Sequence, residues 1–145
     1  MKILTTVLIS LAFSAMAATA LADEGKVYSE GPVVEVTYVK IKPGKFEDYM
    51  KFLATTYRTL MEANKKAGLI QDYGIYQATP RSPQDPDLLL TTTYPNMAAL
   101  DRNEEAEALS VKTVGSMASQ TQAAIDREAI REILGSELLR KLNLK

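Results

Sequence analysis

Tyrosine is the residue type with the most chemical potential in this chain, because the sequence contains no histidine and no cysteine. A tyrosine ring supplies apolar surface and one hydrogen-bonding hydroxyl, which suits the binding of a flat or phenolic molecule. Five tyrosines fall on predicted strands or on the inward side of a predicted helix, and they could line one ligand pocket: Tyr38, Tyr57, Tyr73, Tyr76 and Tyr94. The alternative is that these rings fill the core and a subunit interface, since the pleated surface of a sheet favours tyrosine.

Three further side chains could take part in chemistry. Asp72 and Glu35 could act as general bases if burial raised their pKa, because proton abstraction needs a carboxylate poised near the working pH. Glu35 lies in an otherwise apolar strand, where a cross-strand cation such as Arg140 or Lys141 would make it structural. Arg81 could bind a carboxylate or phosphate with its planar guanidinium, although most loop arginines are only solvated. We expect pairing for Glu35, a rim position for Asp72 and a solvated Arg81.

Charge and spacing argue against several classes of site. The stretch from Asp101 to Glu107 is acidic, but it lacks the alternating oxygen ligands and central glycine of a calcium loop. We therefore expect a solvated helix face there, and we predict no metal and no cofactor. The chain has 17 basic and 18 acidic side chains with no dense basic patch, so nucleic acid is not an expected partner.

The N-terminus has the features of a secretory signal peptide over residues 1–22. Lys2 precedes an apolar run from Ile3 to about Ala18, and Ala20-Leu21-Ala22 provides a cleavage site before the first acidic residue. We predict that the mature protein is periplasmic or secreted by a bacterium and keeps no stable membrane anchor. Without cysteine, its stability must come from packing or self-association rather than from disulfides.

The mature chain reads as one domain, residues 33–145, after a flexible leader at 23–32. The β-branched and aromatic pattern predicts strands at 33–41, 69–78 and 88–94, with a possible bulge at Gly74. Three- and four-residue spacing predicts a helix from Phe46 to about Gly68 and a helical region over 97–131 that breaks near Gly115. We favour a final strand over 137–144, because Gly135-Ser136 would end the helix, although this run could continue as helix.

The order strand, helix, strand, strand, helix, strand is the ferredoxin-like βαββαβ arrangement, an α+β fold with helices on one face of a four-stranded antiparallel sheet. The segment VEVTYVKIKPGKFEDY, Val34 to Tyr49, resembles the first strand, turn and helix start of the dimeric α/β-barrel superfamily. The segment YPNMAAL, Tyr94 to Leu100, resembles that superfamily's second strand-to-helix connection. The resemblance implies a homodimer in which two sheets pair face to face. One helix layer covers only one face of a sheet, which leads to the same expectation.

The resemblance bears only weakly on activity, because these motifs describe turns and packing. The superfamily includes cofactor-independent oxygenases and haem enzymes, and haem-binding relatives generally use an axial histidine that this chain lacks. Our first hypothesis is a non-catalytic exported dimer that binds a small apolar or aromatic molecule or another protein. The alternative is a cofactor-independent oxygenase or isomerase acting on a small aromatic compound. A pocket that joins Asp72 or Glu35 to several tyrosines would favour the enzyme.

Overall fold

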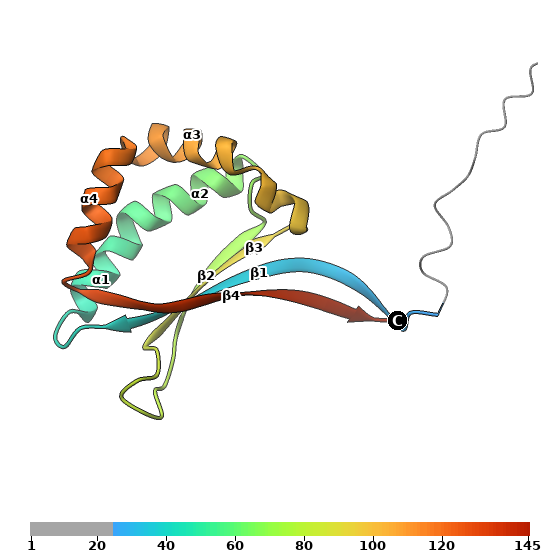
Figure 1. The fold of residues 1–145 in the computed structure, drawn as a ribbon, viewed down its shortest axis with the longest axis horizontal. Coiled ribbons are helices and arrows are strands. Elements are labelled where there is room, and N and C mark those ends of the chain that lie inside the picture. Colours follow the sequence, from blue (N-terminus) through green and yellow to red (C-terminus); the bar gives the residue numbers. More distant parts are fainter. Residues whose placement is uncertain (1–24) are drawn as a thin grey trace, which may run out of the picture.

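A four-stranded antiparallel sheet with helices on one of its faces makes up the structure (Figure 1), a computed structural model that describes residues 25–145. The predicted signal peptide and the first residues of the predicted leader lie outside the described residues. The element order is the predicted βαββαβ, so the ferredoxin-like α+β fold class is confirmed. The C-terminal run, for which helix remained possible, is a strand.

The strands are β1 (Tyr28–Ile41), β2 (Asp72–Gln77), β3 (Leu88–Tyr94) and β4 (Arg131–Leu144). The helices are α1 (Phe46–Phe52), α2 (Arg58–Lys66), α3 (Asn103–Val114) and α4 (Met117–Arg127). A π-helical turn, η1 (Leu53–Tyr57), joins α1 to α2, and a 3-10 turn, η2 (Met97–Asp101), precedes α3.

The strand order is β2-β3-β1-β4, and every neighbouring pair is antiparallel. Side chains alternate between the two faces of a strand, so the register assigns each residue to a face. Val39 and Leu88 pair with one another and pack against Tyr49 and Leu53 of the helical segment. These four buried residues form the centre of the core and identify the face that carries them, the helix face. The other side of the sheet is the open face.

The first strand begins five residues earlier than predicted, so the assignment of residues 28–32 to a flexible leader is wrong. β4 is long enough to supply hydrogen-bonding partners there, with Tyr28 opposite Leu144 and Glu30 opposite Leu142. The register then shifts between Glu30 and Val33, and Pro32, which has no N–H to donate, lies in this irregular stretch. Residues 28–31 and 141–144 thus form a two-stranded arm that extends away from the helices (Figure 1).

Two predicted roles of glycine are also wrong. Gly74 forms no bulge, because it pairs in register with Thr91, and an added Cβ would lie 2.7 Å from the Tyr76 ring. Gly135 does not end a helix: it lies within β4 opposite Tyr38, next to a register shift that leaves one extra residue on β4. The last strand can therefore start at Arg131 rather than at residue 137 and pair with β1 as far as Ile41.

Three glycines lie at the ends of helices, where their positive φ angles allow the chain to turn. Gly44 and Gly68 have φ values of +73° and +69°, the left-handed conformation expected for the first turn and for the end of the first helix. Gly115, with φ of +106°, separates α3 from α4 at the predicted break. The π-helical turn in the first helix carried no sequence signal that we recognised.

Candidate functional site

The sheet divides the five candidate tyrosines between its two faces, so they do not line one pocket. Tyr57, Tyr73 and Tyr94 lie on the helix side, where Tyr57 and Tyr73 make an edge-to-face contact with ring centroids 6.1 Å apart. Tyr38 and Tyr76 lie on the open face, because their strand partner is Leu89 and not Leu88. The alternation of strand side chains explains the split: residues an odd number of positions apart on one strand cannot share a face.

A cavity of about 240 Å³ lies between the helix face and α2, η2 and α3, and we call it the sheet-side cavity. Its walls combine apolar and polar side chains, and the sheet contributes Glu35, Thr92 and Tyr94. The Tyr94 hydroxyl donates a hydrogen bond of 3.1 Å to the Glu35 carboxylate. The predicted pairing of Glu35 with a cross-strand cation is therefore wrong. Arg140 instead forms an ion pair with Glu30, and Glu35 faces Leu138 on β4.

The continuous run of α1, η1 and α2 is called the first helical segment. A second cavity of about 270 Å³, the helix-side cavity, lies between this segment and α4. Its wall is largely apolar and includes Phe52, Tyr57, Leu60 and Val114. The polar side chains of the wall include Arg127. Met61 lines both cavities. Met61, a flexible side chain, therefore lies between the two cavities.

The π-helical turn positions the wall of the helix-side cavity. The Arg58 N–H bonds to the Leu53 carbonyl, five residues back rather than four, and Thr56 and Tyr57 from this turn line the cavity. The Thr55 hydroxyl within this turn donates a hydrogen bond to the Lys51 carbonyl at 2.8 Å, a contact that often bends a helix. Turns of this kind are frequent at functional sites because they redirect side chains without ending a helix.

Two of the inner tyrosines remain protonated far above neutral pH. Burial raises the pKa of Tyr57 to about 12, against a smaller lowering by a hydrogen bond with Thr92. Burial, followed by the nearby Glu35 charge, raises the pKa of Tyr94 to about 12. Both phenols are therefore hydrogen-bond donors at physiological pH. Tyr73 donates instead to Glu62 at 2.7 Å and lines neither cavity.

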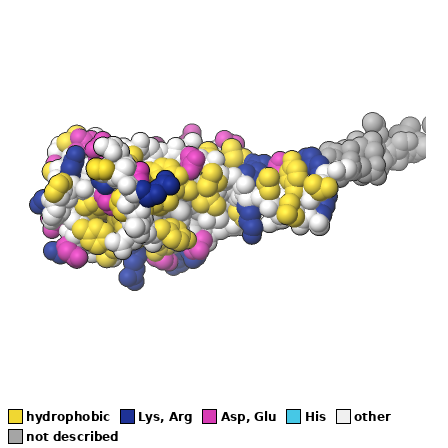
Figure 2. All heavy atoms as spheres, turned by 90° about the horizontal axis from the view of Figure 1, so that it is seen from below, with side chains coloured by type: hydrophobic (Ala, Val, Ile, Leu, Met, Phe, Trp, Pro, Cys, Tyr) yellow, Lys and Arg dark blue, Asp and Glu magenta, His cyan; other side chains and the backbone are white. Residues whose placement is uncertain are grey.

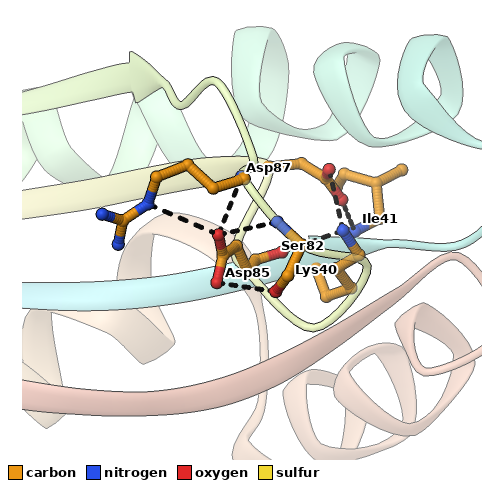
Figure 3. A network of polar contacts seen from close by, with 6 residues as sticks. Lys40, Ile41, Ser82, Asp85 and Asp87 are labelled. Carbon is orange, nitrogen blue, oxygen red and sulfur yellow. Dashed lines mark hydrogen bonds and ion pairs between the residues drawn. The ribbon is translucent and has the colours of Figure 1, made fainter.

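The other sequence candidates lie away from the cavities. Asp72 is exposed at the start of β2 and pairs with Lys65 at 2.8 Å, which lowers the pKa of its carboxyl. Arg81 lies in the loop between β2 and β3, with a side chain that is 94% exposed. That loop is anchored by its aspartates (Figure 3): Asp85 accepts hydrogen bonds from the Arg81 and Ser82 N–H groups, and Asp87 accepts from the Ile41 N–H at 2.8 Å.

Neither a metal cluster nor a membrane-spanning helix is found within residues 25–145. No group of three or more acidic side chains there could hold a metal ion. The same residues contain no helix that is long and apolar enough to cross a membrane.

Sequence reasoning missed Arg127, Arg102 and the double role of Met61. The sequence placed Arg127 only within a helical region. It reaches the cavity because the chain bends at Gly115, after which α4 runs down beside α1 (Figure 1). Arg102 lines the sheet-side cavity. Its guanidinium donates two hydrogen bonds to the Glu105 carboxylate, at 3.1 and 2.7 Å. Only the tertiary contacts of α3 and α4 bring these residues to the site.

No family model matches the chain, and no curated protein matches its sequence. Similar solved structures exist nonetheless. A dimeric ferredoxin-like protein from an uncultured marine organism superposes with a TM-score of 0.52 at 10% identity, over 81% of this chain and 98% of that chain. HapK from Hahella chejuensis gives 0.49 at 6% identity over 75% and 91%, and a chlorite dismutase-like protein gives 0.43 at 13% identity over 77% and 44%. The chain therefore has a ferredoxin-like α+β fold.

Proposed function

We propose that this protein is an exported homodimer that binds a small apolar or aromatic molecule between its sheet and its helices. The observation that carries the proposal is the helix-side cavity of about 270 Å³, whose largely apolar wall includes the side chains of Phe52, Tyr57 and Leu60. Ligand sites combine mostly apolar lining with a few polar groups that orient the ligand. The signal peptide predicted at residues 1–22 supports a periplasmic or secreted location for this binding.

The open face supports the homodimer. Its apolar side chains include Val34, Tyr38, Tyr76, Leu89 and Leu139, and Figure 2 shows hydrophobic groups gathered on this side and along the arm. Leu139 and Tyr76 are 47% and 59% exposed in one subunit. A sheet needs both faces covered to bury such groups, and a second sheet in face-to-face packing would cover this one. The similar marine protein is dimeric by its description.

Native mass spectrometry tests this proposal when the protein is purified gently from its exported compartment. We expect a dimer that carries a discrete small-molecule adduct. Filling the cavity with Val114→Trp should remove the adduct and leave the dimer, whereas Val111→Trp, at an exposed position of the same helix, should retain both. A dimer without adduct that also fails to bind small aromatic probes would contradict the binding function, and a monomer would contradict the paired sheets.

A second candidate function is proton-transfer chemistry on a small hydroxyaromatic compound, as in an isomerase or a cofactor-independent oxygenase. It is favoured by the Glu35 carboxylate, which lines the sheet-side cavity beside the Tyr94 hydroxyl. There Glu35 would accept the proton of the substrate and Tyr94 would donate a hydrogen bond. Replacement of a ring C–H of a bound hydroxyaromatic by C–D in D₂O, followed by NMR, tests this role, because ionisation of the hydroxyl by a base promotes deuteration at carbon: Glu35→Gln should abolish the protein-dependent exchange. Exchange that is equal with and without the protein would exclude the role.

A further inference from the structure

Arg127 differs from the other cationic groups near the two cavities in its surroundings. Its guanidinium carbon lies 4.3 Å from the centre of the Phe52 ring, and the side chain is partly buried at the wall of the helix-side cavity. Arg102, at the other cavity, is neutralised by Glu105. Among residues 25–145, no carboxylate lies within ion-pair distance of the Arg127 guanidinium, and the guanidinium N–H groups donate no hydrogen bond.

The surroundings of Arg127 leave its positive charge uncompensated. Its neighbour Asp126 is exposed and accepts a hydrogen bond from Gln122 instead. Burial, together with the nearby Arg131, lowers the pKa of Arg127, and the Tyr49 hydroxyl and Asp126 only partly oppose this. Tyr49 stacks on Phe52 with ring centroids 5.7 Å apart, so it helps to hold the ring on which the guanidinium rests.

The stacking geometry determines which part of the guanidinium can bind a ligand. The guanidinium carbon lies over the Phe52 ring, and the N–H donors of a guanidinium lie in its plane and point outward from its edge. Such an edge matches the two oxygens of a carboxylate. An apolar body would fill the cavity between Leu60, Val114 and Tyr57, with its charged end at Arg127.

We propose that the ligand of the helix-side cavity is an apolar or aromatic carboxylate, with Arg127 as the residue that binds its carboxylate group. This inference rests on the proposed binding function and specifies its ligand class. An anion would compensate a cation that the described residues leave unpaired. It also separates this site from the sheet-side cavity, where Glu35 would repel a carboxylate.

Paired probes of one shape test the inference: 2-naphthoate, which is anionic at pH 7, and its neutral amide, 2-naphthamide. Isothermal titration calorimetry on the full mature protein should show tighter binding of the acid. In Arg127→Gln, binding of the acid should weaken about tenfold or more, the scale of a lost charge-assisted hydrogen bond, while the amide changes little. The matched control is Arg58→Gln, at an exposed position of α2 that lines neither cavity and should leave both affinities unchanged.

The results distinguish the carboxylate inference from the proposed binding of small molecules in general. Equal binding of acid and amide by the unchanged protein, or an Arg127→Gln variant that weakens both equally, would overturn the carboxylate inference and leave small-molecule binding standing. Absence of binding by both probes would count against the binding function itself. Thermal unfolding of each variant establishes that it is folded, and Arg127→Lys, which keeps the charge without the planar fork, should retain part of the preference for the acid.

Discussion

The hydroxyl of Tyr94 donates a hydrogen bond of 3.1 Å to the carboxylate of Glu35 across strands β3 and β1. The two residues are diagonal neighbours on the helix face, because Tyr94 pairs with Val33 and Glu35 pairs with Thr92. This contact joins a carboxylate to a phenol at the wall of a cavity, and it replaces the ion pair that the sequence led us to expect for Glu35.

The Glu35–Tyr94 contact should be measurable as a coupling free energy. We expect Tyr94→Phe to lower the free energy of unfolding by about 1 kcal/mol, since water in the cavity can replace part of the lost hydrogen bond. A double-mutant cycle with Glu35→Gln, measured by urea unfolding, isolates the pairwise part. Tyr28→Phe, on the two-stranded arm, is the control and should change stability by less than about 0.5 kcal/mol, because no described residue forms a hydrogen bond with its hydroxyl. Fully additive effects would rule out the coupling.

Tyrosine ionisation should be delayed in the folded protein. Tyr57 and Tyr94 have pKa values raised to about 12, above the ordinary 10.0. Each phenol therefore stabilises the fold fully below pH 10, and this contribution is lost as the pH rises through about 12. The ultraviolet absorbance of tyrosinate should show a late phase that Tyr57→Phe and Tyr94→Phe each reduce. A titration that is complete near pH 10 in the folded protein would contradict this expectation.

Two adjacent leucines of β4 distinguish the faces of the sheet. Leu139 lies on the open face opposite Val34, and Leu138 lies on the helix face opposite Glu35, with exposed fractions of 47% and 49%. If the open face pairs with a second copy, Leu139→Asp should convert dimer to monomer, because a carboxylate would be buried without a partner. Leu138→Asp should remain dimeric. Sedimentation of both variants checks this, and a dimeric Leu139→Asp would place the interface elsewhere.

The loop between β2 and β3 should depend on Asp87 and not on Arg81. Asp87 accepts a hydrogen bond from the Ile41 N–H and pairs with Lys40 at 3.1 Å (Figure 3). Asp87→Ala should cost about 2 kcal/mol of unfolding free energy, because it leaves a backbone donor without its partner. Arg81→Ala should cost less than about 0.5 kcal/mol, since that side chain is almost fully exposed. Equal losses in urea unfolding would mean that Asp87 does not anchor the loop.

Local patterns predicted most of the fold because they report local physics. The β-branched run of residues 33–41, the three- and four-residue apolar spacing of residues 46–68 and the helix break near Gly115 each depend on a few neighbouring residues. Asn96 caps the helical turn that follows it by accepting a hydrogen bond from the Ala99 N–H. The start of β1 at Tyr28 could not be predicted in this way, because a partner strand more than a hundred residues later completes its hydrogen bonds.

By itself, the sequence determined the βαββαβ order, the absence of histidine and cysteine chemistry, and an N-terminal segment typical of export. Tertiary structure decided which tyrosines lie on the same side of the sheet. Strand register places Tyr38 and Tyr76 on the open face and Tyr94 on the helix face. Tertiary structure also decided that Arg127 meets Phe52, since that contact depends on how α4 packs over the first helical segment. Residue types restrict the chemistry that is possible, whereas contacts between distant segments determine where it can occur.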